Sequence, residues 1–128
     1  MSTAQDHAEY RASIACGPLL PRVLDRLLGA LAAQANLSVD RLNDLGMVGD
    51  AVSAAAAGSV TDGRLVVVAT PIEGGLELSF GPFAEGGAAR VRRAGGLPGG
   101  GDLFAGVASQ VDIVQDGPAE RLSLRISR

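Results

Sequence analysis

The sequence predicts an α+β fold, a two-layer sandwich in which helices cover one face of a mixed, mostly antiparallel sheet. Two observations lead to this prediction. Two segments in the first half of the chain repeat apolar residues every three or four positions, and the segments around them alternate apolar with polar residues. The length of 128 residues, 47% of them hydrophobic, suits one compact domain. We therefore divide the chain into a flexible tail over residues 1–9 and a single domain over residues 10–128.

The first half of the domain predicts one strand and two helices. Tyr10, Ala12 and Ile14 alternate with polar residues, which is typical of a half-buried strand. Leucines at helical spacing then predict an amphipathic helix that ends near Asn36. Ser38 is a good N-cap for a second helix that runs to about residue 57. This second helix is apolar almost all round, so we expect it to be buried on more than one side.

The second half predicts strands around a glycine-rich segment. Residues 64–70 and 76–80 form an antiparallel hairpin in this interpretation, and Gly81-Pro82 ends it. Residues 84–101 are then glycine-rich, with seven of the 18 glycines between residues 86 and 101, which favours a mobile loop over this segment that carries Arg90, Arg92 and Arg93. Asp102 is expected to cap a short helix over residues 103–110. Two final strands are expected over residues 111–114 and 122–126.

The composition excludes several kinds of chemistry. The chain has no lysine, and His7 and Cys16 are its only histidine and cysteine. A phosphate-binding loop of the Walker type, an intrachain disulfide and a four-ligand zinc site are therefore excluded, and we expect no metal centre. The net charge of −3, without a dense basic cluster, argues against nucleic acid as a partner. The sequence contains no long uncharged apolar run that would predict a membrane span, so we expect a cytoplasmic protein.

Three segments resemble a known superfamily in their order and spacing: Tyr10-Arg11-Ala12-Ser13-Ile14, the stretch LSVDRLNDL over residues 37–45, and Val111-Asp112-Ile113-Val114. They are similar to the first strand, the start of the second helix and the closing segment of the gyrase/histidine-kinase-type (GHKL) ATPases. Within that superfamily the chain looks most like the small bacterial anti-sigma-factor serine kinases. The similarity runs from about Tyr10 to Ile126 and implies a histidine-kinase-like ATPase fold.

The sharp motifs of that superfamily are where this sequence departs from it. The resemblance implies a nucleotide site made by Glu and, four residues later, Asn on the second helix, by Asp-x-Gly after the hairpin, and by a glycine-rich lid. Asp50 and Ala54 occupy the first pair, Ser79 and Gly81 the second, and the run Gly99, Gly100 and Gly101 resembles the lid. Ala54 has no oxygen with which to hold Mg²⁺. Ser79 would replace the carboxylate that accepts a hydrogen bond from adenine.

With these losses, the resemblance implies a non-catalytic regulatory module in bacterial transcription or stress signalling. Its partner would be a protein such as a sigma factor or an anti-sigma antagonist, a homodimer is plausible, and neither ATP nor Mg²⁺ is expected as a cofactor. One alternative is an active serine kinase that uses ATP and Mg²⁺, with Asp50 as the catalytic base. Another is a small-ligand binding domain that uses the vacated space around Met47, Ala54 and Phe80.

Overall fold

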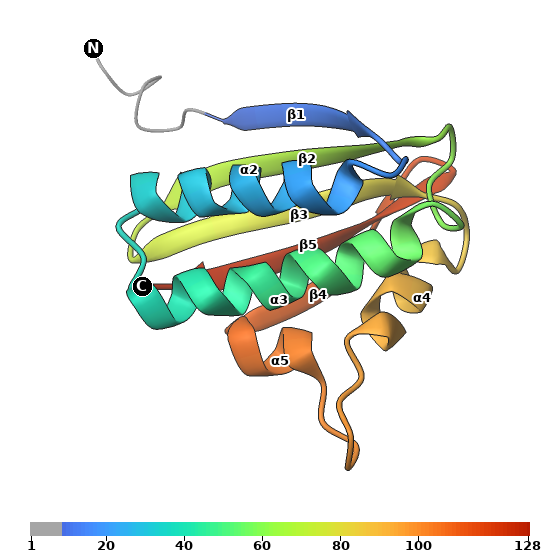
Figure 1. Ribbon diagram of the computed structural model, residues 1–128. Helices are drawn as coiled ribbons and strands as arrows, with labels where there is room; N and C mark the ends of the chain where they lie inside the picture. Colours follow the sequence, from blue (N-terminus) through green and yellow to red (C-terminus); the bar gives the residue numbers. More distant parts are fainter. Residues whose placement is uncertain (1–8) are drawn as a thin grey trace.

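The computed structural model describes residues 9–128 (Figure 1). The tail predicted over residues 1–9, including His7, lies outside the described residues except for Glu9. These residues form five strands and four helices in the order β1 (Tyr10–Ala15), α2 (Leu20–Gln34), α3 (Val39–Ala56), β2 (Arg64–Ile72), β3 (Gly75–Phe83), α4 (Gly87–Ala94), α5 (Leu103–Val107), β4 (Gln110–Asp116) and β5 (Ala119–Ser127).

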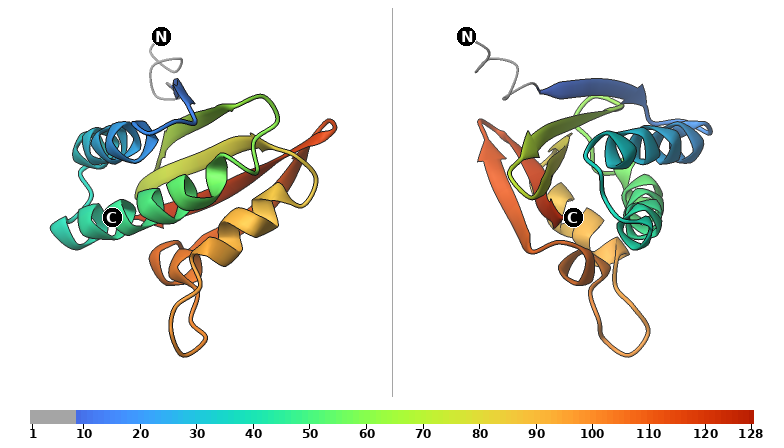
Figure 2. Two further views of the ribbon diagram at one scale, coloured as in Figure 1. Left: turned by 45° about the vertical axis from the view of Figure 1, so that its right-hand side comes forward. Right: turned by 90° about the vertical axis from the view of Figure 1, so that its left-hand side faces the viewer.

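The strands form one sheet in the order β1-β2-β3-β5-β4. Every strand pair in the described chain is antiparallel, so the sheet has none of the parallel pairs that a mixed sheet would contain. All the described helices lie on one side of the sheet, and no element of residues 9–128 covers its other face (Figures 1 and 2). The two-layer α+β sandwich predicted from the sequence is therefore confirmed.

The hydrophobic core lies between the two layers. Alternate residues of the central strands point into it, among them Leu78 and Phe80 of β3 and Leu122 and Leu124 of β5. The helices contribute buried residues at helical spacing, as Leu24 and Leu28 do in α2. On the strands, the residues between these buried ones face the uncovered side of the sheet, which explains the alternation of apolar and polar residues in the sequence.

Helices α2 and α3 begin and end close to where their local signals predict. Pro21 lies in the first turn of α2, where its missing N–H is not needed. The Ser38 hydroxyl caps α3 by accepting a hydrogen bond from the Arg41 amide at 3.2 Å. The two helices pack closely at Gly49, where a Cβ atom would lie 3.1 Å from Leu28. As expected, α3 is buried on more than one side, because it packs against α2, α4 and α5.

The mobile loop predicted over residues 84–101 is wrong for its middle part, which forms α4. The seven glycines lie at residues 86–87, 95–96 and 99–101, so residues 88–94 contain none and consist mainly of the good helix formers alanine and arginine. Glu120 of β5 caps the start of this helix. Its carboxylate accepts hydrogen bonds from the amides of Gly86 and Ala88, both at 3.2 Å. Val91 on the inner side is fully buried.

Two further boundaries differ from the sequence prediction. Strand β3 does not end at Gly81-Pro82 but continues to Phe83, with an irregularity in its pairing to β5 between Phe80 and Phe83. Phe83 is fully buried, and the burial of its side chain favours continuation of the strand. Helix α5 starts after its Asp102 cap as predicted, but it ends at Val107. Over residues 9–128, the structure contains no helix that combines the length and the hydropathy needed to cross a membrane.

Candidate functional site

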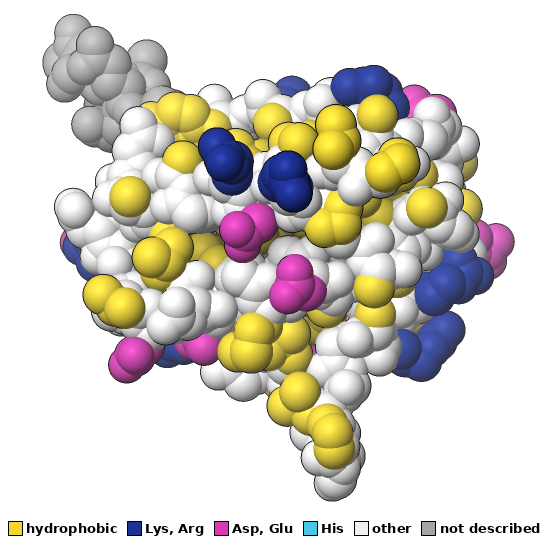
Figure 3. Space-filling model, in the orientation of Figure 1, with side chains coloured by type: hydrophobic (Ala, Val, Ile, Leu, Met, Phe, Trp, Pro, Cys, Tyr) yellow, Lys and Arg dark blue, Asp and Glu magenta, His cyan; other side chains and the backbone are white. Residues whose placement is uncertain are grey.

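A hollow of about 340 Å³ lies between α3 and the segment that follows α4. Helix α3 forms one wall through Met47, Asp50, Ala51 and Ala54. The other wall consists of the end of α4, the residues after it and the start of α5: Ala94, Gly95, Gly96, Leu97 and Leu103. Figure 3 shows hydrophobic side chains on this side of the molecule, where the segment after α4 projects beyond α3. Met47 and Leu97, which line the hollow, are each about half exposed.

Asp50 and Ala54 are the two predicted site residues that the structure brings to this hollow. They are four residues apart on α3, so they lie one helical turn apart on the same side. Both are exposed. Among the described residues, Asp50 is the only charged one that lines the hollow, and Ala54 presents only a methyl group. Ser53, the neighbouring residue with a hydroxyl, does not line the hollow.

Ser79 lies on the opposite face of the sheet. Its neighbours Leu78 and Phe80 point into the core, so the Ser79 side chain points to the uncovered face. There its hydroxyl accepts a hydrogen bond from Nε of Arg121 at 2.5 Å. The structure therefore does not bring Ser79 to the hollow beside Ala54.

Gly81 is an interior residue of β3 rather than the residue that ends the hairpin. A Cβ atom at this position would lie 3.0 Å from the Glu120 carbonyl oxygen and 3.2 Å from the Arg121 side chain. Close packing against β5 therefore explains the glycine, and Gly81 does not line the hollow. Phe80 does not line it either, because its side chain is fully buried in the core. Of the three residues expected around a small-ligand pocket, Met47 and Ala54 do line it.

Gly99, Gly100 and Gly101 form a closed turn beyond the hollow. The Leu97 amide donates to the Gly101 carbonyl at 2.8 Å, and the Gly100 amide donates back to the Leu97 carbonyl at 3.0 Å. Gly99 and Gly100 have positive φ angles of 89° and 99°, a conformation that glycine adopts without strain. None of the three lines the hollow. Two backbone hydrogen bonds therefore join Gly100 and Gly101 to Leu97 in a structured turn.

An ion pair closes the base of this turn. Nε of Arg92 lies 2.9 Å from Oδ2 of Asp102, and the other carboxylate oxygen of Asp102 caps α5 by accepting from the Phe104 amide at 3.0 Å. Arg90 is also engaged, since it donates to the Gly58 carbonyl at 3.0 Å. All three arginines therefore lie on α4 rather than on a mobile loop, and Arg90 and Arg92 are held by hydrogen bonds. Arg93 is exposed on α4.

The glycines that sequence reasoning missed are Gly95 and Gly96, which line the hollow. A Cβ atom on Gly95 would lie 2.6 Å from the ring of Phe104, so the chain passes over that ring only because residue 95 is glycine. The sequence does contain a signal for this wall of the hollow. The glycines fall into three groups, and the stretch between the first two groups is free of glycine.

The residues at the hollow do not fit Mg²⁺ and ATP in the way the family resemblance implies. Ala54 offers no oxygen ligand, and Ser79 lies on the far side of the sheet. Asp50 would be the only carboxylate there. No group of three or more His, Cys, Asp or Glu side chains that could hold a metal ion occurs within residues 9–128.

The fold is similar to that of a solved structure. No family model matches the sequence. No curated protein matches it either. The chain superimposes on the crystal structure of the RsbU and RsbW domains of Rv1364c from Mycobacterium tuberculosis with a TM-score of 0.59 and 16% sequence identity. The match covers 94% of this chain and 32% of that chain, so this protein spans about a third of its length. The likeness shows a histidine-kinase-like α+β fold.

Proposed function

We propose that this chain is a non-catalytic, histidine-kinase-like domain that regulates by binding another protein. The main support is the position of Ala54: it holds its place beside Asp50 at the hollow but offers only a methyl group. Phosphoryl transfer depends on positioning the phosphates and their metal ion, and an alanine contributes nothing to either. The orientation of Ser79, which is bonded to Arg121 on the other face, also supports the proposal.

The rim of the hollow supports a protein as the partner. Met47 of α3 and Leu97 across the hollow both line it and are 48% and 47% exposed, and Val39 and Leu42 in the first turn of α3 are exposed as well. Large apolar side chains exposed together on one side of a molecule mark interaction surfaces. By the family resemblance, we propose a sigma factor or an anti-sigma antagonist as the class of partner, and bacterial transcription or stress signalling as the setting.

Calorimetry with Mg²⁺ and ATP tests whether the site has lost the ability to bind a nucleotide. We expect no binding to the wild-type chain and none to Ala54→Asn. The asparagine restores an oxygen on an exposed position of α3, but Ser79 still faces away. Thermal unfolding would check that the variant is folded. Micromolar, Mg²⁺-dependent binding of ATP to the wild type would overturn the non-catalytic proposal and favour a kinase that uses Asp50.

A second experiment tests the protein-binding surface. Candidate sigma factors and anti-sigma antagonists from the source organism would be titrated against the wild type, Met47→Asp and Val114→Asp. Val114 is a matched control because it is 46% exposed, like Met47 at 48%, but lies on β4. We expect Met47→Asp to weaken binding about tenfold or more, as for a residue at the centre of an interface, and Val114→Asp to have little effect. Equal effects of both substitutions would remove the α3 surface from the proposal.

A further inference from the structure

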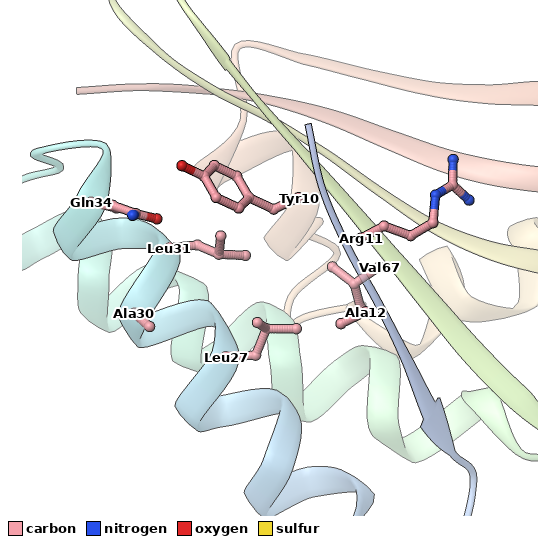
Figure 4. Close-up of a pocket in the computed structure, with 8 residues that line it drawn as sticks. All are labelled: Tyr10, Arg11, Ala12, Leu27, Ala30, Leu31, Gln34 and Val67. Carbon is pink, nitrogen blue, oxygen red and sulfur yellow. The ribbon is translucent and has the colours of Figure 1, made fainter. Parts of the chain in front are cut away.

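A second concave site lies between α2 and the edge strand β1, apart from the hollow beside α3 (Figure 4). This α2–β1 groove has a volume of about 280 Å³ and is lined by Tyr10, Arg11, Ala12, Leu27, Ala30, Leu31, Gln34 and Val67. A smaller recess of about 50 Å³ adjoins it and shares Tyr10, Leu31 and Gln34. No residue of the groove lines the hollow beside α3, so the two sites can be tested separately.

Small side chains create the space in this groove. Ala12 on β1 and Ala30 on α2 face it from its two sides, where a larger residue at either position would fill it (Figure 4). Leu27, Leu31 and Val67 supply the rest of an apolar lining. Binding sites for small molecules are concave and mainly apolar, with a few polar groups that fix the orientation of the ligand.

The polar groups of the groove lie at one end. The Tyr10 hydroxyl and the Gln34 amide point toward the same region in Figure 4, and neither makes a hydrogen bond to another described residue within residues 9–128. Together they can donate and accept hydrogen bonds. Arg11 contributes only the stem of its side chain, because its guanidinium points away and lies 3.4 Å from Glu9. The groove therefore presents no free charge to a ligand.

The volume sets the size of a ligand. An apolar cavity of about 150 Å³ holds benzene. At that volume per atom, 280 Å³ accommodates about eleven non-hydrogen atoms. We propose that the α2–β1 groove binds a neutral, mostly apolar small molecule of this size that carries one hydroxyl or amide group. Its apolar body lies against Leu27, Leu31 and Val67, and its polar group bonds to Tyr10 and Gln34. This inference is independent of the proposed regulatory function.

Tyr10 provides a direct probe of the groove. It is the only tyrosine, and the chain has no tryptophan, so the fluorescence of the protein reports on this one side chain. We would titrate the full chain with decan-1-ol, whose size matches the estimate, and with decanoate as a charged control. We expect a saturable change in Tyr10 fluorescence with the alcohol. Decanoate should bind at least about tenfold more weakly, because its carboxylate would lose water without a positive charge in the groove to pair with.

Matched variants on α2 locate the site. Ala30→Trp would fill the groove, and Ala33→Trp places the same side chain on an exposed position of α2 that does not line it. We expect Ala30→Trp to abolish binding of decan-1-ol in calorimetry and Ala33→Trp to leave it unchanged. Tyr10→Phe and Gln34→Leu should each weaken binding about twofold to tenfold, the net contribution of one hydrogen bond. Thermal unfolding would check that each variant is folded.

Four results would overturn the proposal. The first is the absence of saturable binding, and the second is binding that Ala30→Trp does not weaken. The third is a wild-type dimer in sedimentation that Ala30→Trp converts to a monomer, since a second copy would then occupy the groove. The fourth is a gain of at least tenfold in affinity when residues 1–8 are deleted, because the chain's own first residues would then be the occupant.

Discussion

Glu120 links the end of the sheet to the start of α4, and its removal tests how that helix is held. The carboxylate of Glu120, on β5, receives hydrogen bonds from the amides of Gly86 and Ala88 at 3.2 Å each. The first amides of a helix have no partner within the helix, so an oxygen from elsewhere stabilises its start. The residue at the N-cap itself is Gly86, which has no side chain that could do this.

The expected cost follows from these contacts. Loss of a capping side chain costs about 0.5–2 kcal/mol, and a negative charge at a helix start contributes about 0.3–1 kcal/mol at exposed sites. We therefore expect Glu120→Ala to lower the free energy of unfolding by about 1–2 kcal/mol. Glu120→Gln keeps one acceptor oxygen and loses the charge, so its cost should be smaller, at about 0.5–1 kcal/mol. Glu85→Ala is the control, because Glu85 is exposed in the same turn; it should change stability by less than about 0.5 kcal/mol.

Urea denaturation would measure the three free energies, and hydrogen exchange would follow the amides of residues 88–94. In Glu120→Ala we expect these amides to exchange faster, since α4 would open more often without its cap. If Glu120→Ala were no less stable than Glu85→Ala, and the α4 amides kept their protection, then Glu120 would not be what holds the helix start.

Two other predictions concern the wall of the hollow and the single cysteine. Gly95→Ala should destabilise the protein by about 1–3 kcal/mol in urea denaturation, because the new methyl group would lie 2.6 Å from the buried Phe104 ring. Gly106→Ala is the control: it has open space around it and should be neutral or stabilising. Equal effects of the two substitutions would contradict the crowding at Gly95. Burial raises the pKa of Cys16, and nearby Arg64 partly opposes this effect. Iodoacetamide should therefore react more slowly with the folded chain than with the urea-unfolded chain at the same pH. The free energy of unfolding should not change with the Cys16 titration below the unfolded pKa of about 8.5 and should fall as the pH rises above it; a Cys16→Ala variant with the same alkaline slope would contradict this.

The sequence predicts those elements whose signals are local. Helix α2 has its proline and its leucine spacing, and α3 has Ser38 as its cap, so both are foreseeable from short segments. Helix α4 is foreseeable only in part: residues 88–94 are a glycine-free run of good helix formers, but its cap comes from Glu120, more than thirty residues later in the chain. The same holds for the end of β3, where the burial of Phe83 by the rest of the fold outweighs the turn signal of Gly81-Pro82.

The misplacement of Ser79 has a different cause, because the sequence did contain the signal. Leu76, Leu78 and Phe80 alternate toward the core, and a residue between two of them must point to the other face. The family resemblance assigns Ser79 its role by position along the chain, whereas the direction of its side chain follows from the period of the strand. The alternation along β3 therefore predicts the face that Ser79 occupies independently of the motif.

The departures from a nucleotide site differ in kind, and this bears on the proposed function. At Ala54 the position beside the hollow is retained and only the side chain is lost. At Ser79 the direction is wrong for the hollow and the hydroxyl is bonded to Arg121, so a carboxylate placed there would pair with that arginine on the far face. In the glycine run, backbone hydrogen bonds and the Arg92–Asp102 ion pair fix the turn. Restoring any one residue would leave the other two as they are, whereas a protein-binding role needs only the packed scaffold and the exposed side of α3.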